Sequence, residues 1–395
     1  MDKCKIMVVS RSAHRYPVIG GAPKYSMYLA SKLLERFPSE LEVTFVGQYK
    51  PQADRGHLKF IRVGISFDLN VRSRLLYFLK AFILDVIISI SAIKEILRDD
   101  NFQYVVLNSN IACLLIGLFT KESTELIYVA HDFPMRNPKE HNIFLREIKF
   151  VTNYLLEKMA ICRSTKIVSV SPGISNAVLA TFGRRSVTLT PFPYLLDQID
   201  TFGLANTGGE SVIGSLGLNS GEFILTVGFQ EKRKMFSVLI KAFSKIEDRN
   251  LKLVLVGNGP DNKHLVELVH SLGLTKRVVF LSNVDNSSLR FLYSNTRLFA
   301  LVSKSEGFPV AVVEALSFGS PVAMFLDDGA LKGDDWNFKY FTVESNTDFE
   351  YVAKAINDIL KSRIGSVERQ EIAQWAEKKF NITNYGQAAF RIICG

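Results

Sequence analysis

The chain has few of the residues that mark disulfide-rich or metal-binding proteins. Its four cysteines are spread over 395 residues, and no two of them form a C-x-x-C pair. Such spacing argues against a disulfide framework or a cysteine-based metal cluster. We therefore expect a reducing, cytoplasmic setting and no bound metal.

Long uncharged apolar runs are missing as well. The most apolar segment, 72–98, is broken by Lys80 and Asp85, and its longest uncharged run covers only 86–93. A bilayer-spanning helix needs about 20 apolar residues, so we expect no transmembrane helix. The sequence begins with a strand-like run, and we also expect no signal peptide. The basic, apolar start of this segment, 72–80, could still touch a membrane surface.

The first half of the chain is poor in acidic residues. Residues 1–190 hold 26 Lys and Arg against 16 Asp and Glu, a net charge of +10, whereas residues 191–395 hold 22 against 23. A basic half favours an anionic partner, such as a membrane surface, a nucleic acid or a phosphorylated substrate. We find no helix-turn-helix and no basic segment interleaved with aromatic residues, so we expect no nucleic-acid partner.

Short β-branched runs alternate with helix-like segments in both halves. The runs are KIMVVS, LEVTFVGQ, YVVLNS, LIYVAHD and KIVSVS, and then FILTVG, KLVLVGNG, RVVFLS, RLFALVS and PVAMFL. This alternation predicts an α/β fold with two Rossmann-like, doubly wound parallel sheets. Ligands then gather beyond the carboxyl ends of strands, in a cleft between the two domains.

The Gly, Ser and Thr-rich stretch between these halves predicts the domain bounds. We expect an N-terminal domain over 1–200, a linker over 201–222 and a C-terminal domain over 223–375. The remaining residues, 376–395, are expected to form a C-terminal helix that packs back on the N-terminal domain. The linker is the expected hinge for closure on a ligand.

The stretch SEGFPVAVVEALSFG, residues 305–319, places a carboxylate inside an apolar helix. Pro309 suits the first turn of that helix, and Gly319 suits its end. An unpartnered buried carboxylate is costly, so Glu314 needs a donor, and a sugar diol offers two hydroxyls. Glu306 precedes the helix in the loop, where we expect it at the lip of the site. The free N–H groups of the helix start favour an anion.

The spacing of Glu306 and Glu314, with seven residues between them, resembles the signature of retaining glycosyltransferases of the GT-B fold, family 4 (glycosyl transferases group 1). Other stretches resemble that family in the same order along almost the whole chain. They are GGAPKYSMYLASKLL, YVAHD, KIVSVSPGISNAVL, FILTVGFQEKRKMFSVLIKAF, LVLVGNGP, and RVVFLSNV followed by LRFLYSNTRLFALVS.

The resemblance implies transfer of a sugar from a nucleotide-sugar donor with its anomeric configuration kept. It implies a front-face, metal-independent mechanism with no cofactor, in which the donor phosphate takes the acceptor proton. The C-terminal domain would bind the donor. The basic N-terminal domain would bind a glycan or lipid-linked acceptor of polysaccharide or lipopolysaccharide biosynthesis, at the cytoplasmic face of an anionic membrane.

The resemblance also implies roles for individual residues. His131 and Glu306 would act at the transferred sugar as the catalytic pair. Glu314 would bind the ribose hydroxyls, and Lys234, helped by Arg233, would bind the diphosphate. The rest of the implied donor site consists of Gly20, Gly21, Gly257, Gly307, Phe308 and Pro309.

The chain departs from the family where Phe229 follows the strand glycine, because the family usually has arginine there. Our hypothesis is that Arg233 or Lys232 supplies the missing positive charge. Arg11 and Arg15 of the first domain are the alternative source. A third reading is a weakened donor site, which would make the chain a catalytically silent, nucleotide-sugar-binding subunit.

Several residues have simpler interpretations that stay open. Ser171 could only cap the next helix. The acidic pairs Asp327-Asp328 and Asp334-Asp335 read as polar loop residues rather than metal ligands. Among enzymes, the alternative is another GT-B chemistry, such as a sugar-nucleotide epimerase or a phosphorylase.

Overall fold

A computed structural model of the chain divides into two compact units. Unit 1 comprises Met1–Phe192 and Asn384–Gly395, and unit 2 comprises Pro193–Thr383. The sequence predicts that the N-terminal domain ends at residue 200 and that the C-terminal helix begins at residue 376. The structure describes residues 3–10, 21–47, 58–63, 74–131, 143–193, 195, 217–282, 284–326, 338–380 and 382–395. Most of the expected linker, 201–216, thus lies outside the described residues.

Unit 1 is a parallel sheet with helices on both faces. Its strands are β1 (Cys4–Val9), β2 (Leu41–Gly47), β3 (Leu58–Arg62), β4 (Tyr104–Leu107), β5 (Glu125–Ala130), β6 (Lys166–Ser169) and β7 (Val187–Thr188). Its helices are α1 (Gly21–Arg36), α2 (Arg74–Arg98), α3 (Asn110–Ile116), α4 (Ile143–Arg163), α5 (Pro172–Phe182) and α13 (Tyr385–Cys394).

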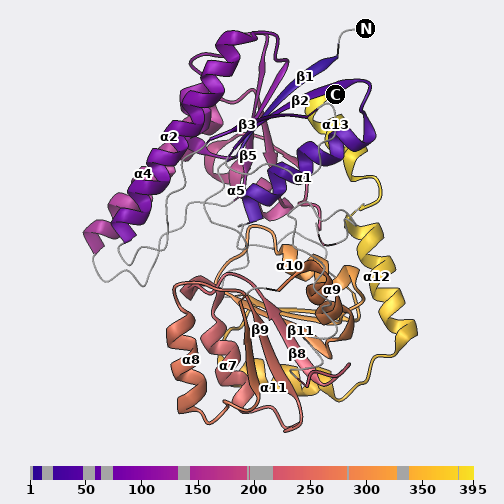
Figure 1. Ribbon diagram of the computed structural model, residues 1–395. Coiled ribbons are helices and arrows are strands. Elements are labelled where there is room, and N and C mark those ends of the chain that lie inside the picture. Colours follow the sequence, from indigo (N-terminus) through magenta and orange to yellow (C-terminus); the bar gives the residue numbers. More distant parts are fainter. Residues whose placement is uncertain are drawn as a thin grey trace. The chain divides into compact units, whose positions relative to one another are not determined.

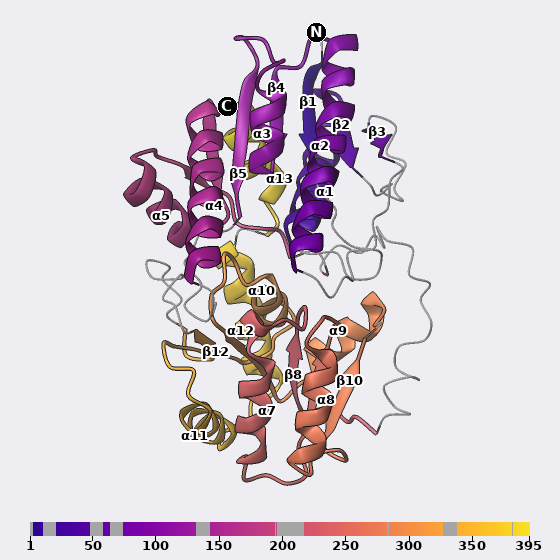
Figure 2. The ribbon, with the colours of Figure 1, turned by 90° about the vertical axis from the view of Figure 1, so that its left-hand side faces the viewer.

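The sheet of unit 1 has the strand order β3-β2-β1-β4-β5-β6-β7, and each neighbouring pair is parallel. Its central strands are buried because α2, α3 and α4 cover one face while α1 and α13 cover the other (Figure 1). A view from the side of α2 and α4 shows α3 between them (Figure 2). The carboxyl end of β5 leads directly to His131.

The C-terminal helix α13 docks closely on α1. A Cβ atom on Gly386 would lie 2.6 Å from the carbonyl oxygen of Lys32, so only glycine allows this approach. Phe37 and Phe390 stack with their ring centroids 4.1 Å apart. At the far end of α13, a hydrogen bond with the Cys394 thiol lowers the pKa of the Cys4 thiol.

Unit 2 repeats the same plan. Its strands are β8 (Phe223–Val227), β9 (Lys252–Val256), β10 (Val278–Leu281), β11 (Leu298–Ser303), β12 (Val322–Leu326) and β13 (Phe341–Glu344). Its helices are α7 (Phe236–Ser244), α8 (Asn262–Ser271), α9 (Asn286–Asn295), α10 (Val310–Ser317), α11 (Phe349–Leu360) and α12 (Ser366–Phe380), with a 3-10 turn, η2 (Lys232–Lys234), before α7.

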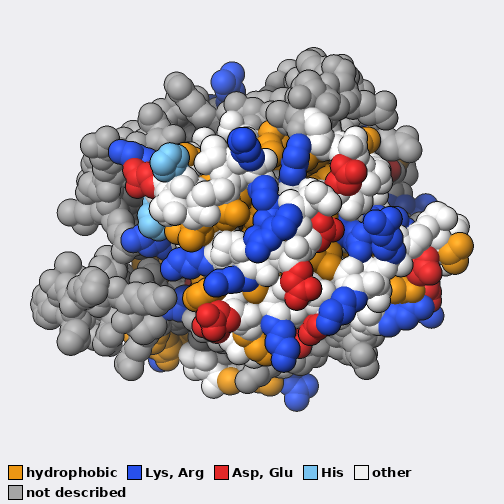
Figure 3. All heavy atoms as spheres, turned by 90° about the horizontal axis from the view of Figure 1, so that it is seen from below, with side chains coloured by type: hydrophobic (Ala, Val, Ile, Leu, Met, Phe, Trp, Pro, Cys, Tyr) orange, Lys and Arg blue, Asp and Glu red, His pale blue; other side chains and the backbone are white. Residues whose placement is uncertain are grey.

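The sheet of unit 2 has the parallel order β10-β9-β8-β11-β12-β13. Helices α7, α8 and α11 cover one face, and α9, α10 and α12 cover the other (Figure 1). Seen from below the view of Figure 1, the molecule shows more Lys and Arg than Asp and Glu side chains, with apolar side chains between them (Figure 3). The two sheets confirm the predicted α/β fold.

None of the described helices is long and apolar enough to cross a membrane. The C-terminal segment, expected as one helix over 376–395, is split. Helix α12 ends at Phe380 within unit 2, and the chain returns to unit 1 only from Asn384.

Candidate functional site

The candidate site of unit 2 is built where the β11–α10 loop meets η2. The backbone N–H of Lys304 donates to the carbonyl oxygen of Arg233 at 2.8 Å, and the Ser303 hydroxyl donates to the same oxygen at 3.3 Å. These bonds bring the loop that carries Glu306 beside a turn of three consecutive cations. The loop lies at the carboxyl end of β11, as the strand-end rule predicts.

Lys234 and Glu306 form a tight ion pair in this loop region. The Lys234 Nζ donates to both carboxylate oxygens of Glu306, at 2.7 and 2.8 Å. Glu306 is only 4% exposed, although the sequence suggested the lip of a site. A carboxylate buried this far needs a counter-charge, and Lys234 supplies it. The structure thus joins two residues that were expected at adjoining parts of the donor, Lys234 at the diphosphate and Glu306 at the transferred sugar.

Arg233 is tied to the same loop. Its guanidinium donates to the carbonyl oxygen of Ser305 at 2.7 Å and to a carboxylate oxygen of Glu231 at 2.9 Å. It also lies 3.8 Å from Glu306. Lys232 is exposed. Arg233 therefore reaches the loop that Glu306 occupies, while Lys232 faces solvent.

The turn that presents these cations is strained. Met235, which follows η2, has φ = 42°, a left-handed conformation that costs free energy for a residue with a side chain. Among the described residues it is the one non-glycine with positive φ. Strain of this kind gathers at functional sites, where the surrounding contacts hold it in place.

Glu314 is buried in α10, as the apolar sequence around it predicted. Its side chain is 2% exposed, and the Tyr293 hydroxyl donates to Oε2 at 3.2 Å. Pro309 lies immediately before the helix, where its carbonyl accepts from Val312. Because Glu306 and Glu314 are both buried, ligand hydroxyls can reach them only after neighbouring groups move.

Gly257 has a structural reason to be glycine. Its φ is 134°, and a Cβ atom there would lie 2.0 Å from the carbonyl oxygen of Gly228. The neighbouring loop is fixed by Gln230, which donates to the Gly257 carbonyl at 3.0 Å and accepts from Asn262 at 2.7 Å. Sequence reasoning missed both polar residues, although Gln230 lies next to the Phe229 departure.

The remaining donor-site predictions have mixed outcomes. Gly307 and Phe308 lie half-buried in the β11–α10 loop, and the Phe308 ring contacts Phe380 edge-on at 6.1 Å. Gly21 is the first residue of α1. Gly20, Arg11 and Arg15 lie outside the described residues, as do the acidic pairs of 327–337. Within the described ranges no three His, Cys, Asp or Glu side chains gather as metal ligands.

In unit 1, His131 follows β5 at the edge of the sheet where ligands are expected. Its Nε2 atom is buried and has no hydrogen-bond partner among the described residues. Burial lowers the pKa of His131 to about 4, so the imidazole is neutral at pH 7. The Tyr25 ring stands at right angles to it, with centroids 5.0 Å apart.

Ser171 caps α5 by accepting from Ile174.

Comparisons with known proteins assign part of the chain, which lies within unit 2, to a family. Residues 213–379 match the family model "Glycosyl transferases group 1". The matches span between 29% and 49% of the length of three curated glycosyltransferases. One of these is the N-acetylgalactosamine-N,N'-diacetylbacillosaminyl-diphospho-undecaprenol 4-alpha-N-acetylgalactosaminyltransferase of Campylobacter jejuni, which is 27% identical over 43% of this chain and 49% of its own length.

Solved structures match over nearly the full chain. A sucrose-phosphate synthase from Thermosynechococcus elongatus has a TM-score of 0.75 at 17% identity, covering 99% of this chain and 97% of the other. HepE of Anabaena in complex with UDP and glucose has a TM-score of 0.69 at 16% identity, covering 98% of both chains. The architecture is thus that of GT-B proteins, and the chain carries a domain of the glycosyl transferases group 1 family.

Proposed function

We propose that the protein is a retaining hexosyltransferase that moves a sugar from a nucleotide-diphosphate donor to a glycan or lipid-linked acceptor. The observation that carries the proposal is the Lys234–Glu306 pair beside η2, with Glu314 buried in the adjacent helix α10. A cation suits the charge of a diphosphate leaving group, and two carboxylates suit sugar and ribose hydroxyls. The reaction requires no metal or cofactor in this proposal.

Donor binding would exchange partners within this site. Lys234 would turn from Glu306 to the diphosphate, and Glu306 would then accept hydrogen bonds from hydroxyls of the transferred sugar. Arg233 is the better candidate to replace the arginine missing at Phe229, because it already contacts the loop. Glu314 would accept from the ribose. Before the donor arrives, Lys234 and Glu306 therefore neutralise each other, and the Tyr293 hydroxyl donates to Glu314.

The chemical step would use the donor itself as base. The glycosidic bond to the diphosphate breaks, the acceptor oxygen attacks from the same face, and a phosphate oxygen takes the acceptor proton. Neutral His131 would steady the positive charge that develops on the sugar. A protonated histidine would oppose that charge, so its low pKa suits this role.

A sugar-nucleotide panel tests the proposed activity. UDP-, GDP-, ADP- and CMP-sugars are incubated with glycan and prenyl-diphosphate-linked acceptors, and nucleotide release and the product's anomeric configuration are followed by NMR. HepE, whose structure contains UDP and glucose, makes UDP-glucose the first donor to try. We expect a retained configuration, and turnover that Glu306→Gln lowers at least 100-fold. An inverted product, a free epimer or a sugar phosphate would overturn the proposal.

We further propose that unit 1 meets its acceptor at the cytoplasmic face of an anionic membrane. The name of the Campylobacter relative includes an undecaprenol-linked sugar, which supports a lipid-linked acceptor. In this chain apolar side chains are exposed along α2 and α4. They form what we call the α2–α4 surface, which comprises Phe82, Ile83, Ile90, Leu97, Val151, Leu155 and Met159.

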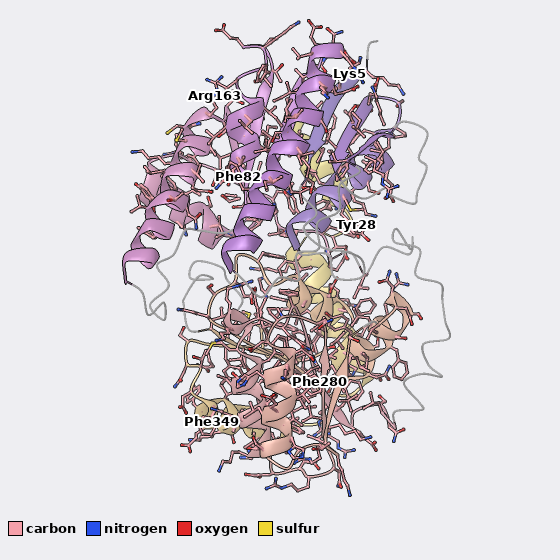
Figure 4. All side chains as sticks on the ribbon, turned by 60° about the vertical axis from the view of Figure 1, so that its left-hand side comes forward. Lys5, Tyr28, Phe82, Arg163, Phe280 and Phe349 are labelled. Carbon is pink, nitrogen blue, oxygen red and sulfur yellow. The ribbon has the colours of Figure 1, made fainter. Side chains whose placement is uncertain are left out.

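Basic residues accompany this surface. Lys94 and Arg98 on α2, and Lys158 and Arg163 on α4, are exposed; Figure 4 labels Phe82 and Arg163 on the two helices. Apolar side chains that enter the headgroup layer, flanked by cations that attract anionic lipid, are the two parts of peripheral membrane binding. Of the membrane contact expected at 72–80, residues 72 and 73 and the side chains of 74–80 lie outside what the structure describes.

Vesicle co-sedimentation tests the membrane proposal. We expect binding to vesicles with 30% phosphatidylglycerol and weak binding to pure phosphatidylcholine, with loss at high salt. Leu155→Gln, at a site 50% exposed, should weaken binding several-fold. Val266→Gln, at a site 46% exposed on α8 of unit 2, is the matched control and should bind as wild type. Equal binding by both variants would contradict the proposal.

A further inference from the structure

Unit 1 contains an aromatic cluster that joins the two segments of the chain from which it is built, Met1–Phe192 and Asn384–Gly395. We call it the α1–α13 cluster, and its members are Tyr25, Tyr28, Phe192 and Tyr385. Tyr28 stacks on Phe192 with centroids 5.9 Å apart, and Tyr385 meets Phe192 at 5.4 Å and 61°. The cluster thus links α1 to α13, the helix that returns from unit 2. None of its four residues takes part in the proposed reaction.

Tyr25 is the member of the cluster that contacts His131. The two rings stand at 86° with centroids 5.0 Å apart, a favourable edge-to-face geometry. The Tyr25 side chain is held in turn, because it is 3% exposed and its hydroxyl donates to the Leu189 carbonyl at 3.5 Å. Burial raises the pKa of the Tyr25 hydroxyl, and the neighbouring Tyr385 side chain acts in the opposite direction and lowers it.

The imidazole of His131 depends on this packing for its orientation. No hydrogen bond from the described residues fixes its buried Nε2 atom, so neighbouring side chains must limit rotation of the ring. Among the described residues, Tyr25 packs edge-to-face against it. We propose that Tyr25 is a positioning residue for His131, and that α13 supports Tyr25 through Tyr385.

The support from α13 depends on its close approach to α1. Gly386, which follows Tyr385, allows that approach, because a Cβ atom there would collide with the Lys32 carbonyl. A larger residue at this position must push α13 outward and Tyr385 with it. The C-terminal helix therefore acts on the ring of His131 through two side chains.

Ring NMR of histidine tests this inference without a substrate. The protein is labelled at its six histidines, and the His131 signals are assigned by their loss in His131→Gln. We expect His131 to titrate near pH 4 in the wild type. In Tyr25→Leu the midpoint should rise by about one unit or more toward the ordinary value of about 6.5, and the tautomer ratio should change. Tyr25→Phe keeps the ring and should stay near wild type.

Tyr28→Leu is the matched control. Tyr28 lies one turn along α1 (Figure 4), is also 3% exposed and packs on Phe192 rather than on His131. Its substitution should destabilise the unit similarly but leave the His131 midpoint and tautomer in place. Gly386→Ala should shift both in the same direction as Tyr25→Leu, by less. Equal His131 titration in wild type and Tyr25→Leu, or an equal shift in Tyr28→Leu, would overturn the inference.

A wild-type measurement covers the case in which Tyr25→Leu does not fold. Nuclear Overhauser contacts between the Tyr25 and His131 ring protons are expected at this separation, and their absence would overturn the inference. The inference rests on the proposed function only for the meaning of His131. Because these spectra need no donor, a failed transferase assay leaves them readable, and a failed titration leaves the transferase proposal standing.

Discussion

The two units share one topology but differ in how they hold their candidate site residues. In both sheets the third, second, first, fourth, fifth and sixth strands follow one another across the sheet. Unit 2 places a buried ion pair, Lys234–Glu306, at the end of its fourth strand. Unit 1 places a neutral histidine, His131, at the end of its fifth strand against the Tyr25 ring. The same topology therefore holds a pair of opposite charges, Lys234 and Glu306, in unit 2 and an uncharged imidazole, His131, in unit 1.

The surfaces of the two units also differ, in their exposed apolar side chains and in their charge. Among the described residues, most exposed large apolar side chains of unit 1 lie on α2 and α4 or just after α3, whereas those of unit 2 are fewer and scattered. The first half of the chain also carries the whole positive excess. Under the proposed function, unit 2 would bind a small-molecule donor and unit 1 a membrane-bound acceptor, and these two differences between the units would follow.

The largest expected effect lies in the backbone of unit 2. Gly257→Ala places a Cβ atom 2.0 Å from the Gly228 carbonyl, so strands β8 and β9 must separate at their ends. We expect a loss of about 4 kcal/mol or more in urea unfolding. Gly221→Ala is the control, since its φ is +75° but nothing lies within 4 Å; it should lose only about 1–2 kcal/mol. Equal losses would show that close approach is not the reason for glycine.

The next effect tests the charge pair of unit 2. Lys234→Met keeps the aliphatic stem but, among the described residues, leaves the buried Glu306 with Arg233 at 3.8 Å as its remaining cationic neighbour. We expect a loss of about 3 kcal/mol in the free energy of unfolding, because an uncompensated carboxylate stays buried. Adding Glu306→Gln to Lys234→Met should recover most of that loss. A double variant as unstable as the sum of the single variants would contradict a coupled pair.

The third effect tests the neutral site of unit 1. The folded-state pKa of His131 is about 4, whereas that of the unfolded chain is about 6.5, so between these values only the unfolded state takes up the proton. Stability contributed by this residue is complete above pH 6.5 and falls as the pH drops toward 4, by about 1–3 kcal/mol.

His131→Gln supplies the reference for this measurement, because glutamine does not titrate. The difference in unfolding free energy between wild type and variant should shrink from pH 7 to pH 4.5. A constant difference would mean that His131 is not held neutral by burial. The contrast between the two units would then lose its basis in unit 1.

The sequence predicted local features of the fold well. Each β-branched run became a strand, as KIMVVS did in β1 (Cys4–Val9), because an apolar run bounded by polar residues has few other ways to be buried. Burial of Glu314 followed from the apolar residues on every side of it. These inferences depend only on neighbours in sequence.

Features that depend on distant pairs could not be predicted in this way. Lys234 and Glu306 are 72 positions apart in the sequence. Because they pair, Glu306 is buried rather than exposed at the lip of the site, where we expected it. Tyr385 reaches the surroundings of His131 only because α13 docks on α1, and no local pattern records that contact. The reason for glycine at Gly257 is likewise a clash with Gly228, which follows another strand, β8.

The most direct test of the donor site in unit 2 is nucleotide-dependent thermal stability. UDP, GDP, ADP and CMP, and their sugars, are added to the wild type and to Glu314→Gln, which keeps the size of the side chain. We predict that one base stabilises the wild type, by about 2.7 kcal/mol at 100 times its dissociation constant, and that the variant loses this stabilisation. No stabilisation by any nucleotide, or equal stabilisation of the variant, would contradict the donor site.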